Sequence, residues 1–175
     1  MGAPTALLVE GDSDRIALET LAPRCALDLA GTGIEVIAMH GVTNVGAFFA
    51  RFAGSRNLVV LCDDGEAAFV QRAARRTGVD VQIEVCVADL EDELIRALGT
   101  DAVERVIAAA GELKSFRALQ QMPAHRDNEP ARQLRRFIGT KSGRKAKYAR
   151  LLVEALDLGQ IPQPLRAALY AGVTQ

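Results

Sequence analysis

The sequence has few of the residues that mark several protein classes. It contains no tryptophan, and aromatic residues make up 5% of the chain, so stacking on single-stranded bases is not expected to be its main source of affinity. Cys25, Cys62 and Cys86 are odd in number and show no C-x-x-C spacing, which argues against a disulfide framework or a zinc site. No apolar run approaches the roughly 18 residues that span a bilayer, and no signal-peptide pattern opens the chain. We therefore expect a reduced, cytoplasmic protein with no membrane partner.

The residues that are present suit a soluble α/β domain with two oppositely charged parts. Hydrophobic residues make up 49% of the 175 positions, enough for a sizeable core in one domain. Residues 1–113 hold 18 Asp and Glu against 9 Lys and Arg, whereas residues 114–150 hold 11 Lys and Arg against Asp127 and Glu129. Such asymmetry suits a protein that binds cations in one place and a polyanion in another, although solvated helix faces would also produce it.

The first hundred residues alternate between strand and helix patterns. Short apolar runs at 7–9, 34–39, 58–62 and 81–85 predict four strands, the last of which could extend to residue 88. Helices are predicted between them at 13–22, ended by Pro23, at 45–52, capped by Asn44, and at 66–77, ended by Gly78. A fourth helix opens at Asp89. This order predicts an α/β, Rossmann-like fold with a roughly four-stranded, mainly parallel sheet flanked by helices.

The remainder of the chain contains no convincing strand pattern. Helices are predicted near 101–110, 112–121, 130–139, 144–157 and 163–171. We expect residues 1–113 to form the α/β core and residues 114–175 to form a basic helical extension that packs on it as one compact unit. Phe116, Phe137 and Tyr148 are expected in the core rather than on a binding surface.

Carboxylates follow three of the predicted strands. Glu10 ends the first strand, Asp63-Asp64-Gly65-Glu66 follows the third, and Asp89-Leu90-Glu91 follows the fourth. The carboxyl ends of parallel strands share one edge of the sheet, so these acids should converge there. Gathered carboxylates repel one another unless a cation neutralises them, and Mg²⁺ prefers such hard oxygen ligands. The sequence therefore predicts one acidic site for divalent metal.

Helix capping explains some of these acids equally well. Asp12, Ser13 and Asp14 suit the start of the first helix, and Asp89 suits an N-cap. Glu66 could simply favour a helix N-terminus, and Asp64 is interpreted as a turn residue. Capping does not explain Glu10, which ends a buried strand just before a glycine.

Three motifs in this order resemble a Toprim domain, and in particular the Toprim part of the OLD (overcoming lysogenization defect) nucleases. They are Val9-Glu10-Gly11-Asp12-Ser13-Asp14, Leu61-Cys62-Asp63 and Asp89-Leu90-Glu91, and a lysine-bearing helix at Gly143-Arg144-Lys145-Ala146-Lys147-Tyr148-Ala149 adds to the resemblance. The Toprim fold is shared by topoisomerases, bacterial primases, recombination-repair proteins and certain nucleases.

The resemblance implies a role for each of the acids and one lysine. Glu10 and Asp14 would hold metal or act in acid–base chemistry, and Asp63 would be the central ligand. Glu91, with Asp89, would complete a second position for Mg²⁺ or Mn²⁺, so that two ions are expected. Lys145 would stabilise charge near the scissile phosphate, with Lys147 as the competing choice.

One departure from the Toprim pattern bears on activity. These domains usually carry Asp-x-Asp after the third strand, whereas the second position after Asp63 is Gly65, so Asp64 or Glu66 would have to substitute. No Walker A pattern occurs in the sequence, so an ATPase partner would be a separate chain.

The leading hypothesis is a metal-dependent Toprim nuclease that hydrolyses phosphodiesters in DNA, or in RNA. A binding or regulatory module that acts with a separate ATPase, and a nucleotidyl or phosphoryl transferase, are the alternatives. Backbone contacts by the basic segment should be salt-sensitive and sequence-tolerant. The residues expected to make them are Arg132, Arg135, Arg136, Lys141, Arg144 and Lys147.

Overall fold

The computed structural model describes residues 4–141, 143–171 and 173. Strands and helices alternate through the first half of the chain, as the apolar runs predict. The elements of this half are β1 (Thr5–Val9), α1 (Asp12–Arg24), β2 (Ile34–Ala38), the 3-10 turn η1 (Val42–Asn44), α2 (Val45–Phe52), β3 (Asn57–Asp63), α3 (Asp64–Thr77), β4 (Gln82–Cys86) and α4 (Leu90–Leu98). Each predicted strand is present to within about three residues at either end.

Helices make up the second half. They are α5 (Thr100–Ala109), α6 (Leu113–Gln121), α7 (Pro130–Gly139), α8 (Arg144–Ala155), η2 (Leu158–Gln160) and α9 (Gln163–Tyr170). The described residues after position 100 contain no strand, as expected. None of the helices among the described residues has the length and hydropathy needed to cross a membrane.

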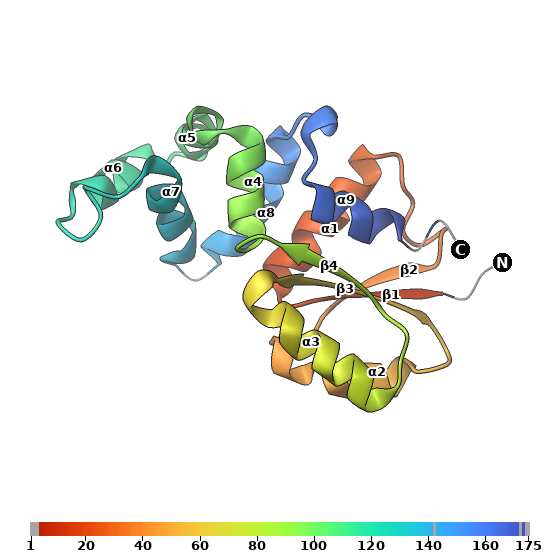
Figure 1. The fold of residues 1–175 in the computed structure, drawn as a ribbon. Helices are drawn as coiled ribbons and strands as arrows, with labels where there is room; N and C mark the ends of the chain where they lie inside the picture. The colour runs from red at the N-terminus through yellow and green to blue at the C-terminus, as the bar shows by residue number, and fades with distance from the viewer. Residues whose placement is uncertain (1–3, 142, 172, 174–175) are drawn as a thin grey trace.

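The four strands form one parallel sheet in the order β2-β1-β3-β4, which confirms the predicted α/β class (Figure 1). Side chains alternate between its two faces because successive residues of a strand point to opposite sides. Leu7 and Val9 of β1 join the core beneath α1, whereas Ala6 and Leu8 join the core beneath α2 and α3. All four of these side chains are fully buried, as a central strand requires.

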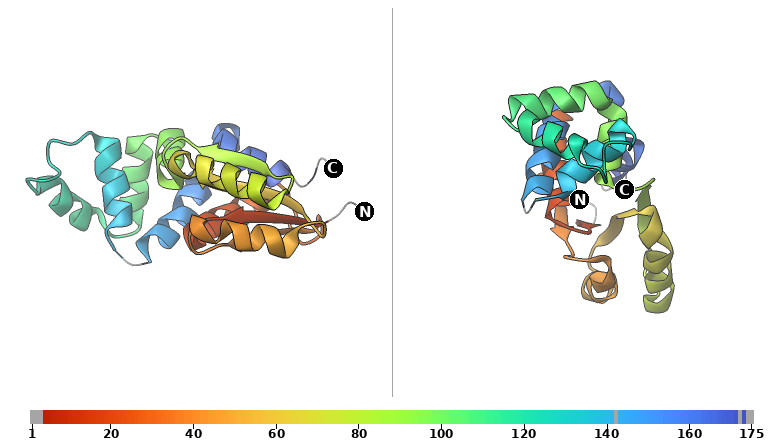
Figure 2. Two further views of the ribbon diagram at one scale, coloured as in Figure 1. Left: turned by 60° about the horizontal axis from the view of Figure 1, so that its bottom comes forward. Right: turned by 90° about the vertical axis from the view of Figure 1, so that its left-hand side faces the viewer.

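The last two helices complete a layer of the α/β unit. α8 packs along α1, and α9 packs against β3 and β4 on the sheet face opposite α2 and α3. Figures 1 and 2 show α5, α6 and α7 projecting as a separate group beyond the carboxyl edge of the sheet. Phe116, Phe137 and Tyr148 are at most 1% exposed, so their prediction as core residues is confirmed.

Three local predictions were wrong. α1 continues through Pro23 to Arg24, whose guanidinium donates to the carbonyl oxygens of Val153 and Leu156 and so ties the end of α1 to α8. Asn44 does not cap α2 with its side chain, because its Nδ2 donates to the carbonyl oxygen of Met39 at 2.9 Å instead. α3 also begins earlier than predicted, at Asp64 rather than residue 66.

The contact between α1 and α8 predicts where the fold is sensitive to truncation. Leu152 on α8 is fully buried in this core, whereas Leu158 in η2 is 42% exposed. We expect Leu152→Ala to lower the free energy of unfolding by about 2–5 kcal/mol, because it leaves a cavity. Leu158→Ala should change it by less than about 0.5 kcal/mol. Urea denaturation of both variants checks this, and equal losses would contradict the assigned packing.

Candidate metal and nucleic-acid site

A cavity of about 370 Å³ opens at the carboxyl edge of the sheet, where β1 and β3 end. All three predicted groups of acids contribute to it, so the sheet brings them together as expected. Lys145 of α8 lies at the same place, although 54 residues separate it from Glu91. The residues lining the cavity are Glu10, Gly11, Ser13, Asp14, His40, Gly41, Asp63, Asp89, Leu90, Glu91 and Lys145.

The backbone around Glu10 is held on both sides. The carbonyl oxygen of Glu10 accepts a hydrogen bond from the Gly41 N–H at 3.1 Å, which ties it to the loop after β2. On the other side, Asp14 Oδ2 accepts from the Gly11 N–H at 2.9 Å and closes the first turn of α1. Asp14 therefore caps its helix and also lines the cavity.

Three carboxylates come close enough to share one cation. Glu10, Asp63 and Glu66 each offer an oxygen, and these oxygens lie within 4.8 Å of one another. Glu66 is placed there because α3 begins directly after β3, so its first turn stands over the end of the strand. Asp64, on the same turn, is exposed and does not belong to this group.

Burial and neighbouring negative charges raise the pKa values of two acids that line the cavity, Asp63 and Asp14. Burial, together with the negative charges of Asp89, Glu66, Asp14 and Glu10, raises the pKa of Asp63 to about 7. Burial also raises the pKa of Asp14 to about 6, against the Gly11 hydrogen bond, which lowers it. A carboxyl group that holds its proton near neutral pH is destabilised as an anion, and a bound cation would remove that penalty.

Two oxygen atoms in the site have no protein partner. Glu66 Oε2 and Glu91 Oε1 are buried and accept no hydrogen bond from any residue that the structure describes. Buried polar atoms without partners are rare and costly in proteins, and a metal ion is one way to satisfy them. Together with the Glu10, Asp63 and Glu66 oxygens, they make a donor set that fits a hard divalent cation.

Asp89, Glu91 and Lys145 form a second group beside the first. Asp89 Oδ1 accepts the Asp92 N–H at 2.8 Å and caps α4, while its Oδ2 lies 2.6 Å from Arg135. Glu91 is 5% exposed, and its Oε2 lies 3.4 Å from Lys145 Nζ. Burial raises the pKa of Glu91, although Lys145 opposes this. Of the two acids, Glu91 therefore has the freer oxygen.

The comparisons with known proteins agree with this geometry. Residues 3–63 match a family model described as the Toprim domain of overcoming lysogenization defect (OLD) protein-like proteins. The chain is similar to OLD-like Toprim domains. The matched segment runs from β1 to the end of β3 and includes Glu10, Asp14 and Asp63. No curated protein matches the chain.

Solved structures extend the likeness of the fold beyond the matched Toprim segment. The C-terminal region of the Burkholderia pseudomallei OLD protein aligns with a TM-score of 0.70 at 20% identity, covering 99% of this chain and 98% of that one. The C-terminal region of the Xanthomonas campestris pv. campestris OLD protein gives 0.70 at 20% identity, with 96% and 93% covered. The Toprim-like core and the later helices thus share one known fold.

Gly65 stands where Toprim domains usually carry the second acid of Asp-x-Asp. In this chain the neighbouring Glu66 supplies an oxygen to the group containing Asp63 instead. A Cβ built on Gly65 would meet no atom within 4 Å, so packing does not require glycine at this position.

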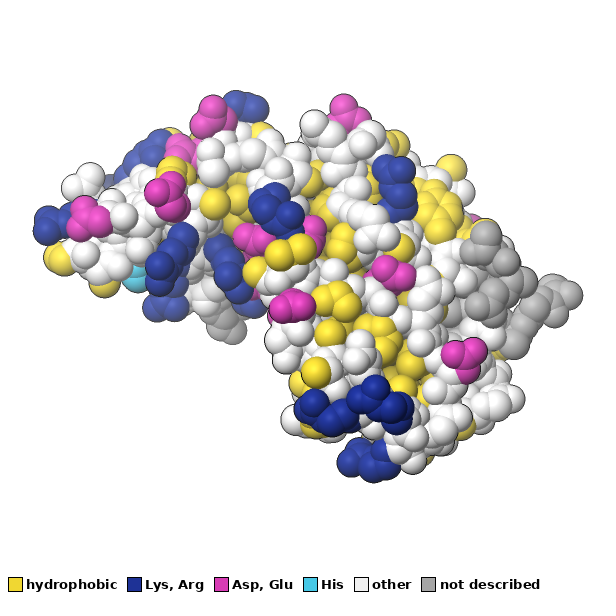
Figure 3. All heavy atoms as spheres, viewed as in Figure 1, with side chains coloured by type: hydrophobic (Ala, Val, Ile, Leu, Met, Phe, Trp, Pro, Cys, Tyr) yellow, Lys and Arg dark blue, Asp and Glu magenta, His cyan; other side chains and the backbone are white. Residues whose placement is uncertain are grey.

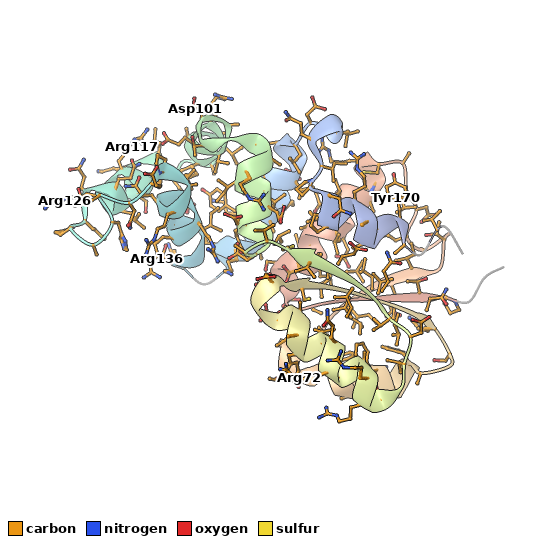
Figure 4. The ribbon with its side chains drawn as sticks, viewed as in Figure 1. Arg72, Asp101, Arg117, Arg126, Arg136 and Tyr170 are labelled. Carbon is orange, nitrogen blue, oxygen red and sulfur yellow. The ribbon has the colours of Figure 1, made fainter. Side chains whose placement is uncertain are left out.

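Basic side chains adjoin the acidic cavity of this Toprim-like domain. A second cavity, of about 290 Å³, shares Asp89, Glu91 and Lys145 with the first and is otherwise lined by α7. Arg136 points outward from α7 in Figure 4, and Lys141 is exposed after it. The α7 residues lining this second cavity are Arg132, Arg135, Arg136 and Gly139.

The structure corrects the prediction for Arg144 and separates the two candidate lysines. Arg144 is 8% exposed and donates to the Phe137 carbonyl oxygen at 3.1 Å and to Thr140 at 2.8 Å, so its guanidinium is not available to a phosphate backbone. Lys147 Nζ lies 3.6 Å from Glu112, away from the residues that line either cavity. Lys145 is the lysine that lines both.

Sequence reasoning missed two residues of the cavity. His40 belongs to none of the sequence motifs, and Ser13 is expected only at the start of a helix, yet both line the cavity. His40 has a φ of 56°, a left-handed conformation that non-glycine residues seldom adopt. Its position directly after β2, at the same sheet edge as Glu10, is the signal that could have identified it.

The raised pKa values predict how stability depends on pH. Asp63 and Asp14 keep protons up to about pH 7 and about pH 6 in the folded state, but release them near their ordinary value of 3.8 when unfolded. The folded protein therefore binds more protons, and the free energy of unfolding should fall between about pH 4 and about pH 7. Urea denaturation in EDTA across this range measures it.

Asp63→Asn is the matched variant, because it removes one of the carboxyl groups whose pKa is raised in the folded state. Its free energy of unfolding should fall less steeply with pH than that of the wild type. A wild type whose stability rises over this range, or an equally steep fall in the variant, would contradict the assignment.

Proposed function

We propose that this protein is a divalent-metal-dependent nuclease that hydrolyses phosphodiester bonds in DNA. The observation that carries the proposal is the convergence of the Glu10, Asp63 and Glu66 oxygens within 4.8 Å of one another, beside a cavity that Glu10, Asp63 and Lys145 line. Similarity to OLD-like Toprim domains supports it, because certain Toprim proteins cleave nucleic acids.

Two positions in the site suit Mg²⁺ or Mn²⁺. Glu10, Asp63 and Glu66 would hold one ion, and Glu91, with Asp14 or Asp89, would hold the other. When bound, such ions activate a water molecule and stabilise the leaving oxygen of a phosphodiester.

The remaining side chains position the phosphate and supply fixed charge. Lys145 is held by Glu91, and the charges of Glu91, Asp89 and Asp14 raise the pKa of its ammonium group, although burial alone would lower it. It therefore stays charged at neutral pH and can stabilise charge that develops on a phosphate oxygen. Asp14, with a pKa of about 6, and Glu10 are placed to exchange protons in the cavity.

The arginines of α7 beside the acidic cavity would bind the backbone of the substrate. Arg132, Arg135 and Arg136 line the cavity that shares Lys145 with the acidic one, so a nucleic-acid backbone held there would reach the metal positions. Phosphate contacts carry no sequence information, so binding should be salt-sensitive and tolerant of sequence.

A regulatory module that acts with a separate ATPase is the second candidate. Gly65 favours it, because the site lacks the second acid of the usual Asp-x-Asp pattern. Such a module would bind metal through Glu10 and Asp63 without cleaving DNA on its own.

Nicking of supercoiled plasmid separates these candidates. We expect the purified wild-type protein to nick plasmid in Mg²⁺ or Mn²⁺ and not in EDTA. Glu10→Gln and Asp63→Asn should each lower the rate at least about 100-fold, because each removes a charged ligand from the site.

Asp101→Asn is the matched control, since Asp101 is exposed on α5, far from the cavity, as labelled in Figure 4. It should nick plasmid at the wild-type rate. Nicking that survives both site substitutions would rule out this site, and absence of nicking by the wild type would favour the regulatory module.

A further inference from the structure

A second basic surface lies within the part of the chain whose net charge is negative. Segments 42–62 and 67–79 contain five arginines and no lysine, aspartate or glutamate. Arg51 lies in the last turn of α2, and Arg72, Arg75 and Arg76 lie on α3. The excess of acids elsewhere in residues 1–113 hides this local excess of positive charge.

The three arginines of α3 share one face of the helix, because they are spaced three and four residues apart. α2 packs against α3, and Arg76 reaches towards α2, since its Nη2 lies 3.4 Å from where a Cβ of Gly46 would stand. Figure 3 shows the resulting dark blue patch over α3 and α2, and Figure 4 labels Arg72 within it. We call this the arginine face, made of Arg72, Arg75 and Arg76.

The charge of the arginine face is not neutralised within the protein. All three arginines are exposed, and none forms an ion pair with a residue that the structure describes. By contrast, the other two arginines of these segments, Arg51 and Arg56, both lie over the Phe52 ring, and Arg56 also pairs with Glu35. A solvated helix surface usually mixes both signs of charge, whereas an unpaired excess of one sign attracts a polyanion.

The arginine face begins close to the acidic cavity. At a rise of about 1.5 Å per residue, Arg72 stands about 9 Å along α3 from Glu66, and Arg76 about 15 Å. One strand of DNA advances about 3.4 Å per nucleotide, so these distances correspond to about three to four phosphates. Figure 3 shows the surface hollowed between α7 and α3, with basic side chains on both sides of the hollow.

We propose that the arginine face is a second phosphate-binding surface, which holds duplex DNA on the side of the hollow opposite α7. The choice of DNA as the ligand rests on the proposed function. Arginine suits this role because its planar guanidinium binds phosphate oxygens in pairs and remains charged at any physiological pH. The duplex would then be held on both sides of the cavity that contains Glu10 and Asp63.

The salt dependence of duplex binding in EDTA, where no metal-dependent cleavage occurs, tests this proposal. Each lost phosphate contact lowers the slope of log K against log salt by about 0.9, so Arg72→Gln/Arg75→Gln/Arg76→Gln should lower it by about 2–3. Affinity at low salt should fall at least about tenfold. Glutamine keeps a similar helix propensity, and thermal melting checks that the variant folds.

Arg105→Gln/Lys114→Gln/Arg150→Gln is the matched control, because it removes the same charge from exposed positions on α5, α6 and α8. It should leave the slope within about one unit of the wild-type value, since these positions lie outside both basic surfaces. An α3 triple variant with the wild-type slope, or a control that loses as much, would overturn the proposal.

Binding and cleavage are measured separately, so the two proposals fail independently. A wild type that nicks plasmid while the α3 variant binds normally overturns only the arginine face. A wild type that does not nick, with slope lost in the α3 variant, overturns only the nuclease. A face that binds poly-glutamate but contributes nothing to duplex binding would belong to an acidic protein partner, which also overturns the proposal.

Discussion

The main constraint on this structure is that several carboxylates, which repel one another, are gathered at one edge of a parallel sheet. Glu10 and Asp63 stand at the ends of neighbouring strands, and the first turn of α3 adds Glu66. The fold thereby buries like charges together at a cost: burial first, and then the neighbouring negative charges, raise the pKa values of Asp63 and Asp14. Clustered carboxylates with raised pKa values are typical of functional sites. A divalent cation bound among them would neutralise their repulsion.

Helices from the second half of the chain supply the opposite charge. Lys145 reaches Glu91 from α8, and Arg135 reaches Asp89 from α7. The buried guanidinium of Arg144 bonds to the Phe137 carbonyl and to Thr140, and so joins the end of α7 to the start of α8. These hydrogen bonds fix the start of α8, from which Lys145 reaches the cavity. The site therefore requires the later helices to be packed in place.

The strands and the acids that follow them could be predicted from the sequence. The side-chain contacts between residues far apart in the chain could not. Strands and the acids that end them were predictable because apolar runs and carboxylates are adjacent in the chain, and the sheet edge unites them. The burial of Arg144 was not, because its partners are Phe137 of α7 and Glu112, the residue before α6. His40 lacked any spacing motif, and the net charge of residues 1–113 concealed the arginines of α3.

The most direct measurement of the central claim is Mn²⁺ binding followed by electron paramagnetic resonance. The wild type should bind Mn²⁺ at neutral pH, and Asp63→Asn should bind it at least about tenfold more weakly, because the variant loses the charge at the centre of the cluster. Binding that competes with Mg²⁺ and disappears in Asp63→Asn would support a metal site at the sheet edge. Equal binding by both proteins would contradict it.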